Sequence, residues 1–146
     1  MALDRQTLLE RAAAIRLVIF DVDGVLTDGS LFFGNDGNEY KAFNIRDGHG
    51  IKMLQANGVE VAIISGRRAV STERRMADLG VRHVQLGVED KLAAFTALLA
   101  GLEIGAGEVA YLGDDIIDLP VMRRVGLAVT VADADAFVKT HAHWQT

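Results

Sequence analysis

The sequence predicts an α/β fold in which helices cover both faces of a parallel sheet. Four apolar runs, rich in β-branched residues and typical of buried strands, recur along the 146 residues. The segments between the runs have the length of helices, and connections of this kind join parallel strands. The sequence contains no internal repeat, low-complexity tract or linker. We therefore expect one domain over residues 1–146.

The four apolar runs end alike, because polar residues follow directly after the last apolar residue of each. The runs cover residues 17–20, 59–64, 108–112 and 126–131. A shorter strand is expected at residues 81–86, and a short terminal strand near His143 and Trp144.

Helical spacing of apolar residues predicts helices between these strands. The predicted helices cover residues 3–14, 69–79, 92–99 and 116–123, with one more short helix near the C-terminus. Gly80 ends the second helix, and Pro120 lies in the first turns of the fourth, where proline is tolerated. Residues 44–50 are polar and glycine-rich, so we expect a loop that enters a helix at Ile51, with Asp47 as a candidate N-cap.

A β-hairpin is predicted at about residues 30–44, directly after the first strand. Leu31–Phe33 and Glu39–Phe43 flank the turn-forming stretch Gly34–Gly37. The hairpin would stand over the end of the first strand as a small flap. Exposed aromatic side chains on it would favour oligomerisation, whereas packing on the hairpin's own domain is an equally open alternative.

Composition excludes several classes of function. The chain has 15 basic and 20 acidic residues, a net charge of −5, which argues against non-specific nucleic-acid binding. The absence of cysteine excludes disulfide scaffolds and thiol chemistry. Residues 1–14 do not resemble a signal peptide, and no run approaches the roughly 18 apolar residues of a membrane span. We expect a cytoplasmic protein without membrane or nucleic-acid partners.

Two carboxylates, Asp21 and Asp23, mark the end of the first strand. Residues two apart in an extended chain point to the same side, and open α/β sheets bind ligands at this edge. Two carboxylates held close together need a cation, a shared proton or separation by water. The simpler alternative is an Asp-Gly turn with solvated side chains.

Later strand ends supply further polar groups for the same edge. Ser65 follows the second run, Lys91 opens a helix, and Asp114, Asp115 and Asp118 follow the third run. Carboxylate oxygens are suitable ligands for Mg²⁺, and a serine and a lysine would bind a phosphate.

Each of these residues also has a structural explanation when it is taken alone. Ser65 and Asp115 would serve as caps, Asp118 would favour the helix dipole, and Lys91 would be a solvated surface lysine. Their common position at strand ends favours one shared site.

The chemistry expected of this site is phosphoryl transfer. Asp21 would attack the phosphorus and form an aspartyl-phosphate. Asp23 would give a proton to the leaving alkoxide and later accept one from water. Asp21 and Asp114 would hold Mg²⁺, which together with Lys91 would cancel the charge of the phosphate.

The ordered motifs resemble those of the haloacid dehalogenase superfamily of phosphatases. They are Asp21-Val-Asp23-Gly-Val-Leu-Thr27, Ser65-Gly-Arg67, Lys91 and Gly113-Asp-Asp-Ile-Ile-Asp118, and they span most of the chain. The resemblance implies the Rossmann-like sheet of that superfamily. The sequence looks most like the 3-deoxy-D-manno-octulosonate 8-phosphate phosphatases, which have a hairpin like residues 31–43, no separate cap domain, and a segment like residues 43–50.

The resemblance implies an Mg²⁺-dependent phosphatase of that sugar phosphate, on the route to lipopolysaccharide. It also implies a homotetramer joined through the hairpins, the backbone carbonyl of Asp23 as a third metal ligand, and Asp115 and Asp118 lying behind the ligands. The substrate contacts implied in the same way are Asp23, Asn44, Ile45, Arg46, Asp47, Gly48, Lys52, Arg67, Arg75 and Lys91. Two of these residues have structural alternatives: Arg67 would be an exposed residue after a turn, and Arg75 a charge on a helix surface.

Relatives usually continue past a segment like His141–Trp144 into a glycine-rich tail with an arginine and a helix. Were that tail missing, we would expect altered substrate closure or product release. His141 and His143 form an H-x-H pair, a weak metal signal that we interpret as structural.

The functional alternatives are a phosphatase of another sugar phosphate, such as a nine-carbon keto-acid phosphate, a phospho-accepting receiver domain, and an inactive oligomerisation module. Asp23 argues against the receiver, which needs no acid for a leaving group.

Overall fold

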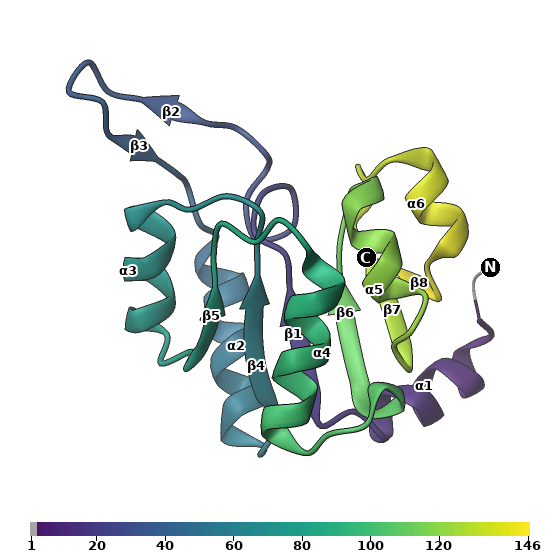
Figure 1. Ribbon diagram of the computed structural model, residues 1–146. Helices are drawn as coiled ribbons and strands as arrows, with labels where there is room; N and C mark the ends of the chain where they lie inside the picture. The colour runs from purple at the N-terminus through teal and green to yellow at the C-terminus, as the bar shows by residue number, and fades with distance from the viewer. Residues whose placement is uncertain (1–2) are drawn as a thin grey trace.

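A six-stranded parallel sheet forms the centre of the molecule (Figure 1). This computed structural model describes residues 3–146, and Met1 and Ala2 lie outside the described residues. The strand order is β5-β4-β1-β6-β7-β8, with every neighbouring pair parallel. The strands are β1 (Leu17–Phe20), β4 (Glu60–Ile64), β5 (His83–Gln85), β6 (Val109–Leu112), β7 (Leu127–Thr130) and β8 (Trp144–Gln145). The predicted parallel α/β sheet is confirmed.

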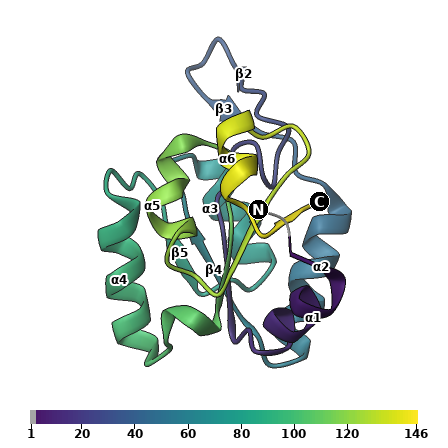
Figure 2. The same ribbon diagram turned by 90° about the vertical axis from the view of Figure 1, so that its right-hand side faces the viewer.

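Helices cover both faces of the sheet, as Figures 1 and 2 show. One face carries α1 (Arg5–Ala13), α2 (Ile45–Ala56) and α3 (Val70–Asp78), and the other carries α4 (Lys91–Leu102), α5 (Leu119–Met122) and α6 (Ala136–His141). Alternate residues of β1 supply the two cores: Val18 and Phe20 pack on the α2–α3 side, and Leu17 and Ile19 on the α4–α6 side. Within residues 3–146, none of the helices has the length and apolar character needed to cross a membrane.

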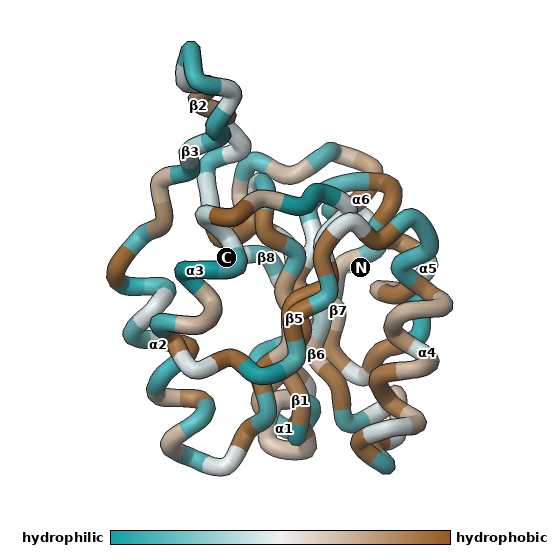
Figure 3. The backbone as a smooth tube through the Cα atoms, turned by 60° about the vertical axis from the view of Figure 1, so that its left-hand side comes forward, coloured by the Kyte–Doolittle hydropathy of each residue, from teal (hydrophilic) through white to brown (hydrophobic). Residues whose placement is uncertain are grey.

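The predicted hairpin is present as β2 (Phe32–Phe33) paired antiparallel with β3 (Glu39–Tyr40). It projects from the carboxyl edge of the sheet, and its tip is hydrophilic (Figures 1 and 3). Phe32, Phe33 and Tyr40 are 54%, 71% and 52% exposed. These aromatic side chains therefore do not pack on their own domain, so the alternative that they pack there is wrong.

The expected loop at residues 44–50 is wrong, because α2 already begins at Ile45. Asn44 is the N-cap, and its side-chain oxygen accepts the backbone N–H of Arg46 at 2.8 Å, so Asp47 lies inside the first turn. Glycine disfavours helix interiors, which explains the mistaken prediction. The glycine at position 48 lets Arg75 approach the helix closely, since a Cβ there would lie 2.3 Å from a guanidinium nitrogen and Arg75 would have to move.

The helix predicted at residues 116–123 is shorter and begins as the 3₁₀ turn η2 (Ile116–Asp118), before α5. A second 3₁₀ turn, η1 (Ala106–Glu108), precedes β6. The Asp118 carboxylate folds back and accepts the backbone N–H groups of Asp114 and Asp115, at 3.1 and 3.2 Å. This tight turn replaces a regular first helical turn and aims the aspartates at the edge of the sheet.

Candidate active site

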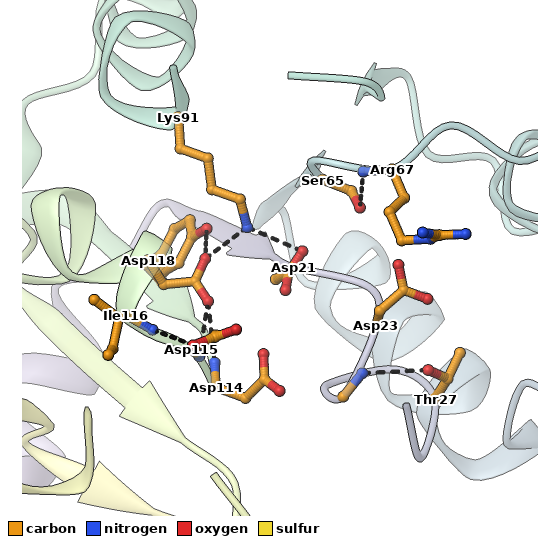
Figure 4. Close-up of polar contacts among 12 residues, drawn as sticks. Asp21, Asp23, Thr27, Ser65, Arg67, Lys91, Asp114, Asp115, Ile116 and Asp118 are labelled. Atoms are coloured by element: carbon orange, nitrogen blue, oxygen red, sulfur yellow. Dashed lines mark hydrogen bonds and ion pairs between the residues drawn. The ribbon is translucent and has the colours of Figure 1, made fainter. Parts of the chain in front are cut away.

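Three carboxylates from distant parts of the chain meet at the carboxyl edge of the sheet (Figure 4). Asp21 follows β1, and Asp114 and Asp118 follow β6, the neighbour of β1 in the sheet. One oxygen from each carboxylate lies within 4.8 Å of the other two. The parallel pairing of β1 with β6 thus places Asp21 and Asp114 together, as the positions at strand ends predict.

Lys91, the first residue of α4, ties this cluster together. Its ammonium lies 2.6 Å from Asp118 Oδ1 and 3.1 Å from Asp21 Oδ1, and only 4% of its side chain is exposed. The buried hydroxyl of Tyr111 also donates to Asp118 Oδ1, at 2.6 Å. Lys91 is therefore a buried partner of two carboxylates, and the alternative of a solvated surface lysine is wrong.

The cluster carries more negative than positive charge, since three carboxylates face one ammonium. Burial raises the pKa of Asp21 to about 6, an effect that Asp118 increases and Lys91 reduces. Burial raises the pKa of Asp114 to about 7, and the neighbouring aspartates add to this shift. Burial alone would lower the pKa of Lys91, but Asp21 and Asp118 raise it above its ordinary value. A divalent cation would balance the excess charge.

The residues present fit a hard divalent cation such as Mg²⁺. Asp114 Oδ1 is buried without a hydrogen-bond partner, and buried acceptors in proteins normally have one. Asp118 uses both of its oxygens in hydrogen bonds to protein groups. Carboxylate oxygens are what Mg²⁺ prefers, so Asp114 and Asp21 are the available ligands of this cluster. Asp118 lies in the cluster and positions its neighbours.

The loop after β1 is shaped to approach these carboxylates closely. Gly24 has φ +86°, and a Cβ on it would lie 2.0 Å from Asp114 Oδ2. The Thr27 hydroxyl accepts the backbone N–H groups of Gly24 and Gly29, at 3.3 and 3.2 Å. Asp21 is only 5% exposed, so the alternative of a solvated Asp-Gly turn is wrong for this residue.

Asp23 and Arg67 lie on the other side of Asp21, near Ser65 (Figure 4). Ser65 is 2% exposed, and its Oγ accepts the backbone N–H of Arg67 at 3.4 Å. It does not cap α3, whose N-cap is Ala69, but the contact with the backbone N–H two residues on agrees with the alternative of a turn cap. Asp23 Oδ1 accepts a hydrogen bond from Lys41 Nζ at 2.6 Å.

Most of the substrate contacts implied by the resemblance belong to α2 and α3, and two of them, Asn44 and Asp47, line a cavity with residues 25–28 of the loop after β1. Within residues 3–146, no hydrogen bond or ion pair joins them to the carboxylate cluster. They are the residues Asn44, Ile45, Arg46, Asp47, Gly48 and Lys52 of the α2 segment, and Arg75 of α3. Arg75 lies against Gly48, and burial raises the pKa of Asp47 while Arg75 partly opposes this.

Asp115 and His143 have structural partners. Asp115 is the N-cap of η2 and accepts the backbone N–H of Ile116 at 2.6 Å. His143 Nδ1 accepts the backbone N–H of Ala128 at 2.9 Å, which joins the chain end to β7. The interpretation of His143 as structural agrees with this contact.

Sequence reasoning missed Lys41, Glu39 and Tyr111. Glu39 forms an ion pair with Arg67, and Lys41 one with Asp23, so both charged residues of the hairpin base reach the site. Their spacing of two residues, which puts both on one face of a strand, was the only available signal. Tyr111 looks like any aromatic residue of an apolar strand.

Comparisons with known proteins identify the relatives of this chain. The family described as haloacid dehalogenase-like hydrolase matches residues 84–146. The chain is 52% identical over 138 residues to the 3-deoxy-D-manno-octulosonate 8-phosphate phosphatase KdsC of Yersinia pestis, a match that covers 94% of this chain and 74% of that protein.

Solved structures give the same result. The crystal structure of 3-deoxy-D-manno-octulosonate 8-phosphate phosphatase from Yersinia pestis superposes with a TM-score of 0.94 at 51% identity, over 96% of this chain and 76% of that one. The phosphatase of that name from Moraxella catarrhalis, in complex with magnesium ion, phosphate ion and KDO, superposes with a TM-score of 0.94 at 34% identity. That match covers 97% of this chain and 82% of the other.

Proposed function

The chain belongs to the 3-deoxy-D-manno-octulosonate 8-phosphate phosphatases of the haloacid dehalogenase superfamily, and from this premise we propose how it works. It is a phosphoric monoester hydrolase that uses Mg²⁺ to release phosphate from the sugar acid phosphate of that name, in the supply of lipopolysaccharide precursors. The convergence of the Asp21, Asp114 and Asp118 oxygens within 4.8 Å carries this proposal.

In the proposed mechanism Asp21 is the nucleophile. Its carboxylate attacks the phosphorus, and the bond from phosphorus to the sugar oxygen breaks. Asp21 and Asp114, with the backbone carbonyl of Asp23, would hold the metal, and Mg²⁺ bound there would supply positive charge where the phosphoryl group is transferred. Lys91, fixed by Asp118, adds a second positive charge beside Asp21.

Asp23 moves the protons of the two steps. It gives a proton to the sugar oxygen as that bond breaks, and it takes one from the water that then attacks the phosphorus. The second step breaks the bond from phosphorus to Asp21 and regenerates the carboxylate. Ser65, buried at the end of β4, is placed to donate its hydroxyl to a phosphate oxygen.

Phosphate release from the sugar acid phosphate tests this function. Wild-type protein should turn over with Mg²⁺ and stop with chelator, and Asp21→Asn should lower kcat by about 10³-fold or more while leaving the circular dichroism spectrum unchanged. Asp78→Asn, which changes an exposed carboxylate on α3, is the control. Retained turnover in Asp21→Asn would overturn the assignment of the nucleophile.

The substrate is tested by a comparison of kcat/KM across sugar phosphates. We expect the eight-carbon keto-acid phosphate to give the highest value. A higher kcat/KM for a nine-carbon keto-acid phosphate would move the proposal to that substrate.

We further propose that four copies of the chain assemble through the hairpin. Support comes from the exposed side chains of Phe32, Phe33 and Tyr40 on a projecting pair of strands. In such an assembly each copy's open site would be partly covered by a neighbouring copy. The one-domain organisation and a cytoplasmic location stay predictions from the sequence, which limited proteolysis and cell fractionation would test.

A further inference from the structure

The base of the hairpin is tied to the active site by two ion pairs. Glu39 and Lys41 are two residues apart, with Glu39 in β3 and Lys41 directly after it, so their side chains leave the strand on the same side. Glu39 pairs with Arg67, and Lys41 Nζ donates to Asp23 Oδ1 at 2.6 Å. The base of the hairpin is therefore fixed to two residues of the site.

The Lys41 contact differs from the ion pairs on the surface of the protein. Only 1% of the Lys41 side chain is exposed, against 68% for Arg68 and 76% for Arg82, which also form ion pairs. A lysine ammonium is almost never buried unless it is paired, because an unpaired charge in the interior is very costly. Asp23 is the one ion-pair partner of Lys41 within residues 3–146. The burial of Lys41 thus depends on keeping Asp23 in place.

The contact constrains only one of the two oxygens of Asp23. Lys41 holds Oδ1, so rotation of the carboxylate is restricted and Oδ2 is left for another partner. Figure 4 shows the carboxyl group of Asp23 on the side of the site where Ser65 and Arg67 lie, across from Asp21. A proton donor to the leaving group has to lie within hydrogen-bond reach of that oxygen.

We propose that Lys41 is the positioning residue of Asp23, an inference that rests on the proposed function, in which Asp23 is the acid and base. Lys41 holds the Asp23 carboxyl so that its free oxygen faces the sugar oxygen. The proton then passes from Asp23 to that oxygen as the bond to phosphorus breaks. Lys41 itself touches neither the phosphorus nor the nucleophile, and Lys91 remains the cation beside Asp21.

Leaving-group dependence separates this role from a general effect of charge. An alkoxide needs a proton to leave, whereas p-nitrophenolate leaves without one, so only the sugar phosphate depends on a well-placed acid in the first step. The value of kcat/KM reports the steps through the departure of the leaving group. The ratio of the two kcat/KM values therefore measures how well Asp23 is positioned.

The experiment compares Lys41→Met, Lys41→Arg, Lys139→Met and wild type on the sugar acid phosphate and on p-nitrophenyl phosphate, all with Mg²⁺. We expect Lys41→Met to lower kcat/KM for the sugar acid phosphate by about 10- to 100-fold, and that for the aryl phosphate by less than about threefold. Lys41→Arg, which keeps the charge, should recover part of the loss. Lys139 lies on α6, and its variant should behave as wild type.

An equal loss on both substrates would overturn the inference, because it would mean that Lys41 binds phosphate or supports the fold. No loss on either substrate would overturn it as well. Asp23→Asn, measured on the same two substrates, tests the role of Asp23 separately from the role of Lys41. If Asp23→Asn shows no selective loss on the sugar acid phosphate, the proposed role of Asp23 fails. If Asp23→Asn shows that loss and Lys41→Met does not, only the role of Lys41 fails.

Discussion

Replacing Asp114 by asparagine should stabilise the metal-free protein while it abolishes the response to Mg²⁺. The Asp114 carboxylate lies within 4.8 Å of the oxygens of Asp21 and Asp118, and one Lys91 ammonium balances only part of this charge. Two unit charges at that separation repel by about 3 kcal/mol at an effective dielectric constant of 20. Because Asp114 is half-buried, solvent screens part of this, and we expect a gain of about 1 to 2 kcal/mol.

The sign of the pH dependence follows from the pKa of Asp114, which is raised from 3.8 to about 7 in the folded protein. A carboxyl group with a raised pKa contributes stability that is complete below pH 3.8 and is lost as the pH rises through about 7. Wild-type protein loses that stability over this window and the asparagine variant does not. The two should therefore differ most above pH 7 and little near pH 4.

Thermal unfolding in chelator at pH 8 is the assay. A gain of this size corresponds to a rise in Tm of about 3 to 6 °C for a chain of this length. Adding Mg²⁺ should raise the Tm of wild-type protein and leave that of Asp114→Asn unchanged, because binding to the folded state alone stabilises it. Asp78→Asn, an exposed site, should show the wild-type Tm and the wild-type response. A lower Tm for Asp114→Asn than for wild type in chelator would refute the claim that these carboxylates repel one another.

Four further predictions concern the metal, the lysine, the loop and the hairpin. The affinity for Mg²⁺, measured by calorimetry, should weaken as the pH falls below about 7, because protons compete for Asp114. Lys91→Met should lower the free energy of unfolding by about 3 to 5 kcal/mol in denaturant titrations, since it leaves the buried carboxylates of Asp21 and Asp118 without their cation, and unchanged stability would contradict the contact network. Gly24→Ala should abolish phosphate release, because its Cβ would lie 2.0 Å from Asp114 Oδ2, and wild-type turnover would show that the loop has another conformation. Phe33→Asp should reduce the mass measured by light scattering to that of a smaller assembly or a monomer, whereas an unchanged tetramer would place the interface elsewhere.

The carboxylate cluster was predictable from the sequence because a parallel sheet brings the carboxyl ends of its strands to one edge. Asp21 and Asp114 each follow an apolar strand, and β1 and β6 are direct neighbours in the sheet. Their positions at strand ends in the sequence are therefore enough to predict that the two aspartates meet. Lys91 was predicted as a cation for the phosphate, whereas its burial between Asp21 and Asp118 was not predicted.

Other features depend on tertiary packing that no local pattern records. The first turns of α2, from Ile45 to the predicted start at Ile51, were missed because glycines disfavour helices, whereas Gly48 lies where Arg75 approaches the helix closely. The Lys41 contact with Asp23 depends on the direction in which the hairpin leaves the sheet, which the turn sequence does not determine. The exposed face of the hairpin was predicted only as one of two alternatives, since the alternation of residues does not say what covers them.

The most direct test of the proposed mechanism identifies the residue that carries the phosphoryl group. In Asp23→Asn protein with Mg²⁺ and p-nitrophenyl phosphate, the first step needs no acid while the second lacks its base, so an acyl phosphate should accumulate. After acid quenching, tritiated borohydride reduces the acyl phosphate to tritium-labelled homoserine and releases the phosphate, and peptide mapping should then locate the tritium label at position 21. A label on any other residue, or steady release of nitrophenol with neither a burst nor a labelled protein, would contradict the proposed chemistry.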